Sequence, residues 1–176
     1  MNKGNLIEVI GDVTTPQRVE ENEIVVIPHV CNDIGKMGAG IALAIKRKWE
    51  GAFNIYAGHI ARVGQGEKNL GSTGFWDSND NGVYDNVIVC NMIAQHNFIG
   101  SNNSRPLNYG ALAKCMNDVA ERIIRERYNC FFNEIRIHTG KFGSDLAGGD
   151  WNIISEMIDY LWLNKGIDVV IYEYVG

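Results

Sequence analysis

The sequence predicts an α/β fold in which helices cover both faces of a mixed sheet. Runs typical of strands alternate along the chain with runs typical of helices. A continuous apolar run at residues 24–27 indicates a strand that is buried on both faces. Between residues 106 and 127 the apolar residues recur at helical spacing, which indicates a long amphipathic helix.

The first elements are two strands. Residues 6–10 alternate weakly in polarity and end at Gly11-Asp12, which indicates a strand followed by a turn. The run 24–27 follows after a polar segment and predicts the second, buried strand.

A helix and a hairpin come next. Residues 40–49 combine an apolar stretch with a basic end, the pattern of a helix. Strand-like runs at 74–76 and 87–90 flank the segment 77–82, which is dense in turn-forming residues. We therefore expect the two runs to pair as a hairpin.

The last third of the chain returns to the same alternation. After the helix at 106–127, residues 134–138 alternate as a strand. Asp150 suits the N-cap of a helix, because a short carboxylate can accept a bond from a free backbone N–H. That helix carries apolar residues at helical spacing, namely Trp151, Ile154, Met157, Ile158 and Leu161. Residues 168–172 predict a closing buried strand.

Length and composition predict one soluble domain over residues 1–176. The net charge of −5 disfavours nucleic acid and anionic membranes as partners. No stretch approaches the roughly 20 apolar residues of a membrane span, and the first residues do not read as a signal peptide. We expect a cytoplasmic protein with a small-molecule ligand, whose oligomeric state the sequence does not determine.

The cysteines do not indicate a metal site. None of the four forms a Cys-x-x-Cys pair; they are Cys31, Cys90, Cys115 and Cys130. Reduced thiols among apolar neighbours are the simpler reading. We expect neither a metal nor a cofactor.

Two glycine-bearing loops, residues 36–42 and 142–151, are the strongest functional signal. Each follows a strand-like run and precedes a helix-like run. Free backbone N–H groups at a helix N-terminus bind anions, and glycine lets a ligand approach the backbone closely. A pair of such loops predicts a clamp around a diphosphate. The ligand-contacting residues expected in the first loop are Met37, Gly38, Ala39, Gly40 and Ile41.

Polar residues precede the first loop. His29 can exchange a proton near neutral pH, and Asn32 can bond to vicinal hydroxyls of a ribose. A structural role for His29 is the alternative. A dinucleotide-binding Rossmann loop is disfavoured, because the segment 38–43 lacks the third glycine of that fingerprint and follows the second strand instead of the first.

In the second loop, Gly143 and Gly148 allow tight turns, while Ser144 and the neighbouring backbone amides can bind a phosphate. Phe142 can lie against a sugar or a base. Asp145 is unexpected beside a phosphate, since like charges repel. It either binds a hydroxyl or activates water, or it points to solvent.

Taken together these segments resemble the macrodomain family, in the branch of ADP-ribose-1″-phosphate phosphatases and terminal ADP-ribose glycohydrolases. The resemblance covers nearly the whole chain. It rests on Gly11-Asp12-Val13, His29-x-x-Asn32, the string from Met37 to Ala42, and Leu146-Ala147-Gly148-Gly149-x-Trp151.

The resemblance implies a three-layer α/β/α fold that binds ADP-ribose at the strand ends. Asp12, next to Val13, would accept a hydrogen bond from the adenine amino group. Asn32 would hold the distal ribose, with residues 38–41 beside its phosphate. The loop 142–148, including Leu146 and Ala147, would cover the diphosphate from the other side.

The chain also departs from this branch. The glycohydrolase uses a lysine shortly after the middle strand, but residues 90–96 contain none. Its loop aspartate falls on Ala147, and Asp145 stands where similar sequences have glycine. The lysine–aspartate route therefore lacks both of its groups.

These observations favour hydrolysis of ADP-ribose-1″-phosphate to ADP-ribose and phosphate. His29 would act as general acid or base, and Asp145 would position water. Two alternatives stay open: a binding module without catalysis, and removal of ADP-ribose from modified macromolecules. The sequence also leaves open whether Gln95, His96 and the polar loop 97–105 reach the ligand.

Overall fold

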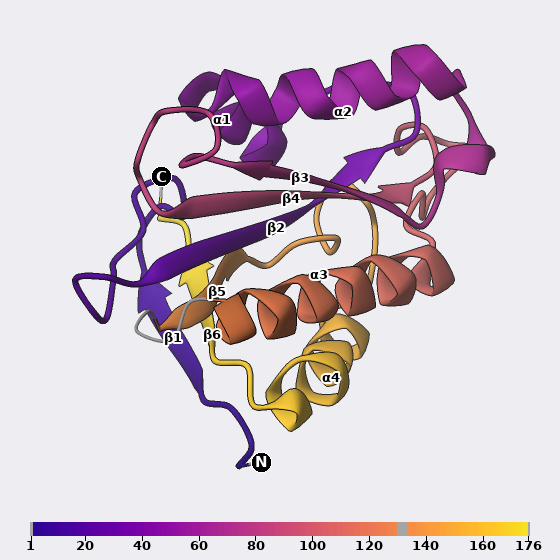
Figure 1. The fold of residues 1–176 in the computed structure, drawn as a ribbon. Helices are drawn as coiled ribbons and strands as arrows, with labels where there is room; N and C mark the ends of the chain where they lie inside the picture. Colours follow the sequence, from indigo (N-terminus) through magenta and orange to yellow (C-terminus); the bar gives the residue numbers. More distant parts are fainter. Residues whose placement is uncertain (1, 130–133, 176) are drawn as a thin grey trace.

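The computed structural model describes residues 2–129 and 134–175. Within them six strands form one mixed sheet in the order β1-β6-β5-β2-β4-β3 (Figure 1). Neighbouring strands are parallel except β3, which runs antiparallel to β4. The strands are β1 Leu6–Ile10, β2 Ile24–Asn32, β3 Ser72–Asp77, β4 Val87–Gln95, β5 Ile135–Gly140 and β6 Val169–Glu173.

Helices cover the two faces of this sheet. Helices α1 (Gly40–Lys48) and α2 (Glu50–Val63) lie on one face, and α3 (Tyr109–Asn129) and α4 (Trp151–Leu161) lie on the other (Figure 1). Short 3₁₀ helices, η1 (Glu67–Asn69) and η2 (Leu163–Lys165), follow α2 and α4. The predicted three-layer α/β/α class is confirmed.

The buried strands explain the continuous apolar runs. In β2, Ile24 and Val26 pack toward α3 and α4, while Val25 and Ile27 join the cluster that contains Trp49 of the α1–α2 junction. Because successive side chains of a strand point to opposite faces, a strand covered on both sides needs apolar residues at every position.

The second strand is longer than expected. It continues past residue 27 to Asn32, although Pro28 lacks the N–H that a ladder requires. The ladder between β2 and β5 covers residues 24–26, so Pro28 lies beyond it. Beyond the ladder, β5 contacts β2 through a side chain: the Thr139 hydroxyl donates a hydrogen bond to the Pro28 carbonyl oxygen at 2.9 Å. The carboxyl ends of these two strands thus lead directly into the two glycine loops.

Most other expected elements are present. The hairpin of β3 and β4 pairs from Ser72↔Ile93 to Asp77↔Ile88, and the long amphipathic helix is α3. Helix α2 was not anticipated. It begins immediately after Trp49, whose N–H still bonds to the Ile45 carbonyl, so the chain turns from one helix into the next without a loop.

Asp150 caps α4 as predicted. Its Oδ1 accepts a hydrogen bond of 2.8 Å from the Asn152 N–H. We expect Asp150→Ala to lower the free energy of unfolding by about 1 kcal/mol, because this N–H loses its partner. Chemical denaturation measures the change. Asp150→Ser keeps an acceptor at the cap and is the matched control; an equal loss in both variants would contradict the capping argument.

Candidate functional site

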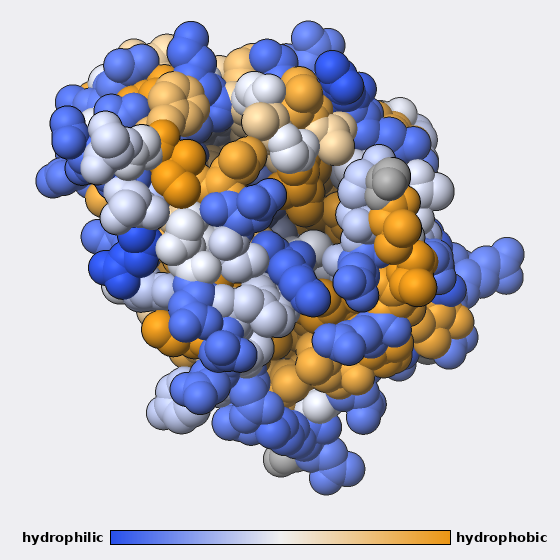
Figure 2. All heavy atoms as spheres, turned by 180° about the vertical axis from the view of Figure 1, so that it is seen from behind, coloured by the Kyte–Doolittle hydropathy of each residue, from blue (hydrophilic) through white to orange (hydrophobic). Residues whose placement is uncertain are grey.

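The two glycine loops meet at the carboxyl end of the sheet. A Cβ placed on Gly40, the first residue of α1, would lie 3.5 Å from Leu146 Cδ1 of the second loop. A Cβ on Gly140, at the end of β5, would lie 3.7 Å from Ile41 Cδ1. Ligands of open α/β sheets bind beyond the carboxyl ends of the strands. Viewed from behind, the surface is hollowed, and apolar residues line part of the hollow (Figure 2).

The first loop presents backbone N–H groups. Leu43 is the first residue of α1 whose N–H bonds within the helix, to the Ala39 carbonyl at 3.2 Å. No side chain of the described residues caps this end. Gly38, Ala39 and Gly40 are exposed, whereas Met37 is buried against α2 and anchors the loop. An uncapped helix N-terminus with exposed glycines is suited to an anionic group.

Asn32 holds this loop in place. Its Oδ1 accepts hydrogen bonds from the Tyr56 hydroxyl at 2.6 Å and from the N–H groups of Lys36 and Ile34. Its Nδ2 donates to the Lys36 carbonyl at 2.7 Å. The second hydrogen of Nδ2 has no partner among the described residues, and the residue is 6% exposed. The expected ribose contact of Asn32 is therefore limited to that hydrogen.

The second loop is built on tight turns. Gly143 and Gly148 have φ angles of +74° and +67°, which favour glycine. A Cβ on Gly148 would lie 2.6 Å from the Ser104 carbonyl oxygen, so the backbones approach closely there. The Ser144 hydroxyl donates to the Lys141 carbonyl at 2.9 Å, and Ala147 is buried. Exposed Leu146 is the side chain that faces the first loop.

Phe142 lies in the hydrophobic core. Its ring is 3% exposed and packs against Trp151 and Trp162 in the core on the α3–α4 side. The expected contact of Phe142 with a sugar or base has no support in this geometry, because the ring faces α4.

The residues at the end of β1 form a turn. Asp12 Oδ1 accepts hydrogen bonds of 2.8 Å from both the N–H and the hydroxyl of Thr14. The Asp12 side chain is exposed, while Val13 is buried and packs in the cluster that includes Ile41. Val13 thus connects this turn to the first glycine loop.

His29 lies inside the protein. It is completely buried in β2, and its Nε2 lies 2.8 Å from Asn91 Oδ1. Asn91 in turn donates to the Ala52 carbonyl of α2 at 2.9 Å. Burial lowers the pKa of His29 to about 4, opposed by the hydrogen bond to Asn91. The expected proton-transfer role of His29 is not supported, because its ring has no access to a ligand and is neutral at pH 7.

This burial predicts a pH dependence of stability. Below pH 6.5 His29 becomes protonated in the unfolded chain but stays neutral in the folded protein. The free energy of unfolding therefore falls as the pH drops from 6.5 to about 4. Between pH 7 and pH 5 the wild type should lose about 2 kcal/mol more of its unfolding free energy than His29→Gln loses. Chemical denaturation at both pH values measures it. His59→Gln, on α2, is the control, and equal pH slopes in wild type and His29→Gln would refute the explanation.

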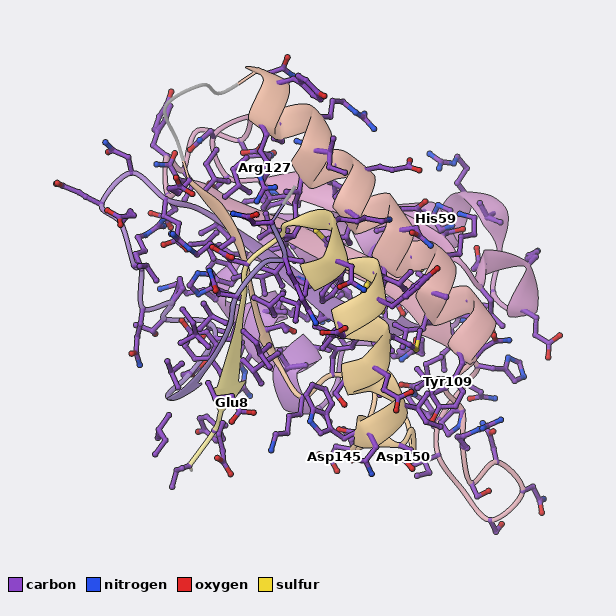
Figure 3. The ribbon with its side chains drawn as sticks, turned by 90° about the horizontal axis from the view of Figure 1, so that it is seen from below. Glu8, His59, Tyr109, Arg127, Asp145 and Asp150 are labelled. Carbon is purple, nitrogen blue, oxygen red and sulfur yellow. The ribbon has the colours of Figure 1, made fainter. Side chains whose placement is uncertain are left out.

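Asp145 lies at the surface. Figure 3 shows it close to Asp150, at the amino end of α4, and its side chain is exposed. Its backbone carbonyl closes a turn by accepting the Gly148 N–H at 2.9 Å. Of the alternatives from the sequence, exposure to solvent is what the geometry shows; a role in positioning water stays a prediction.

Sequence reasoning did not identify one pair at this end of the sheet. Asp33, directly after β2, is completely buried, and its Oδ2 lies 2.7 Å from His96 Nδ1, just after β4. The only available signal was that both residues follow the carboxyl ends of buried strands.

Known proteins of similar structure have the same fold as this chain. No profile of a known protein family matches the chain. A macrodomain protein from Streptomyces coelicolor is 30% identical over 96% of this chain and 99% of that one, with a TM-score of 0.71. The chain belongs to the macrodomain family.

Other solved structures share this macrodomain fold. A protein of unknown function from Bacteroides thetaiotaomicron has a TM-score of 0.82 and 29% identity, over 99% of this chain and 100% of that one. The macrodomain of Thermus aquaticus DarG has a TM-score of 0.68 at 20% identity, over 97% and 99%.

A curated relative matches a shorter segment. An ADP-ribose 1″-phosphate phosphatase from Aspergillus oryzae is 37% identical over 60 residues, which are 34% of this macrodomain and 27% of that protein. The match thus spans only about a quarter of the relative's length.

Two further observations concern the described residues alone. None of their helices is long and apolar enough to cross a membrane. Their His, Cys, Asp and Glu side chains form no group of three or more that could hold a metal ion.

Proposed function

We propose that this macrodomain binds ADP-ribose between its two glycine loops and hydrolyses ADP-ribose-1″-phosphate to ADP-ribose and phosphate. The observation that carries the proposal is the meeting of the loops, Gly40 with Leu146 and Ile41 with Gly140, beside the uncapped start of α1. Such an arrangement offers backbone donors to a diphosphate from two sides. The similarity to a named phosphatase supports the reaction.

Within this proposal the ligand lies across the strand ends. The adenine lies at Asp12 and Val13, and the diphosphate lies between residues 38–41 and residues 143–148. The distal ribose then lies near Asn32, where the chain leaves β2. The net charge of −5 fits a small-molecule ligand in the cytoplasm better than a nucleic acid.

Binding without catalysis is the second candidate. Buried His29 and the alanine at position 147, in place of the aspartate of the related glycohydrolase, favour it. Neither residue can transfer a proton to or from a ligand.

A phosphorus NMR time course with ADP-ribose-1″-phosphate in chelated buffer separates the candidates. We expect the 1″ signal to disappear as free phosphate grows. Shifted diphosphate signals without turnover would instead establish the binding module. Unchanged spectra would refute ADP-ribose recognition altogether.

A further inference from the structure

The carboxylate of Asp33 is held in a fixed orientation. It is completely buried, and its two oxygens bond to different groups. Oδ1 accepts from the Asn97 N–H at 2.9 Å, and Oδ2 contacts His96 Nδ1 at 2.7 Å. The backbone of Asp33 is hydrogen-bonded as well. Its N–H donates to the Gln95 carbonyl at 2.9 Å, and its carbonyl oxygen accepts from the Gly66 N–H.

His96 is accessible, unlike its partner. Its side chain is 44% exposed, whereas that of Asp33 is 0% exposed. A buried carboxylate that accepts from Nδ1 leaves Nε2 to exchange a proton with a ligand or water. Among the described residues the charged groups facing His96 are Asp33, from the end of β2, and Glu67 of η1, whose Oε1 lies 3.7 Å from Nε2.

The electrostatics favour a protonated ring. The hydrogen bond to Asp33 raises the pKa of His96 above its ordinary value, against a smaller effect of burial, and the charges of Asp33 and Glu67 raise it further. A larger fraction of His96 is thereby cationic near neutral pH and able to donate a proton.

The fold places this pair at the carboxyl end of the sheet, where β2 and β4 end. Asp33 follows Asn32 directly, so it belongs to the loop that leads into α1. The polar segment that starts at His96 returns to the second glycine loop, where the Leu107 N–H donates to the Ala147 carbonyl at 3.0 Å. Asn103 supports the segment by donating to the His96 carbonyl at 2.9 Å. His96 therefore lies at the carboxyl end of the sheet, directly after Gln95, which pairs with Asn32 at the end of β2.

We propose that His96 is the proton donor for the phosphate hydrolysis and that Asp33 is its positioning residue. The proposal rests on the proposed function. The oxygen of a water molecule forms a bond to phosphorus, and the bond between phosphorus and O1″ breaks with its electron pair moving to O1″. Protonated Nε2 gives its proton to O1″, and the proton lost by the attacking water restores the imidazolium. Water and the ester thus yield ADP-ribose and hydrogen phosphate.

The pair has features that a purely structural contact does not require. The Asp33 carboxylate is buried and fully bonded, whereas the His96 side chain is 44% exposed. Among the described residues Nε2 has no partner within hydrogen-bond distance, and the Glu67 carboxylate lies 3.7 Å away.

The test compares His96→Asn with His59→Asn, a histidine of α2 bonded to Asn69. General acid catalysis contributes about 100-fold or more, so we expect kcat of His96→Asn to fall by at least that factor with KM little changed. His59→Asn should keep the wild-type kcat. An unchanged kcat in His96→Asn, or an equal loss in both variants, would overturn the role of His96.

The pH profile tests Asp33. For a proton donor, kcat falls as the pH rises through the pKa of His96, and Asp33→Asn should move this fall to lower pH because it removes the group that raises that pKa. If Asp33→Asn does not fold, NMR titration of His96 in the wild type replaces it: a pKa not raised above the ordinary value would overturn the positioning role.

Two further readouts separate this inference from the proposed function. Hydrolysis in heavy-oxygen water should label the phosphate; label on the ribose would mean cleavage at C1″ and overturn the step. Calorimetric titration with ADP-ribose checks binding by itself. Binding without wild-type turnover would overturn the role of His96 and leave ADP-ribose recognition intact, whereas failure to bind would overturn both.

Discussion

Glu23→Leu should lower the free energy of unfolding by about 3–5 kcal/mol, the usual cost of removing one partner from a buried ion pair. Glu23 is completely buried, and its Oε1 lies 2.5 Å from His138 Nε2, which is equally buried. Its Oε2 lies 3.2 Å from Arg136 and accepts from the Val19 N–H at 2.7 Å. The variant leaves all of these donors without their acceptor.

The same contacts predict how the effect depends on pH. Burial opposes ionisation of Glu23, but the hydrogen bond and charge of His138, with backbone donors, hold its pKa below the ordinary value. A carboxyl with a depressed folded pKa stabilises the protein fully above the unfolded pKa and loses this contribution as the pH falls. The difference between wild type and Glu23→Leu should therefore shrink below about pH 4.5.

Chemical denaturation across this pH range measures both effects. Glu21→Leu, at an exposed neighbouring position, is the matched control and should change stability by at most about 0.5 kcal/mol. A loss in Glu23→Leu no larger than that of the control would refute the network. The hydrogen bonds of Glu23 also extend to the segment that follows Asp12, because His138 Nδ1 contacts the Tyr172 hydroxyl, which accepts from the Gln17 N–H.

Gly38→Val should weaken ADP-ribose binding by about 100-fold, or about 2.7 kcal/mol, without destabilising the protein. A Cβ at Gly38 would meet no atom within 4 Å, so the folded chain accommodates the side chain. The added methyl groups would instead occupy space that the proposed diphosphate needs beside the first glycine loop.

Calorimetric titration with ADP-ribose measures the loss. Gly58→Val is the control, since a Cβ at Gly58, on α2, also meets nothing within 4 Å. Its affinity should equal that of the wild type, and both variants should keep the wild-type unfolding midpoint. Wild-type affinity in Gly38→Val would remove the first loop from the binding site.

Several features follow from local pattern alone. The alternation of strands and helices, the Asp150 cap and the positions of both glycine loops depend on the spacing of apolar residues and on backbone chemistry within a few residues. Such signals are complete within one segment, which is why the α/β class and the succession of strands along the chain could be predicted.

The placement of His29 shows where this reasoning fails. The sequence predicts His29 at the end of the second strand, beside the first glycine loop, with a proton-transfer role and a structural role as alternatives. The strand continues to Asn32, and His29 then shares the face of Val25 and Ile27, which α1 and α2 cover. Past Pro28 the strand is held by its pairing with β4, which continues to Asn32↔Gln95, a contact that the local sequence does not encode.

Local periodicity thus determined the fold class, the two glycine loops and the capped helix of this macrodomain. Only the tertiary structure decided which polar side chains are buried and which meet at the carboxyl end of the sheet. Asp33 and His96 are 63 residues apart and meet because β2 and β4 are neighbours whose carboxyl ends coincide. Phe142 faces inward because α4 folds back over it. Side-chain direction depends on strand register and on the layer that packs above, and both arise only when distant segments come together.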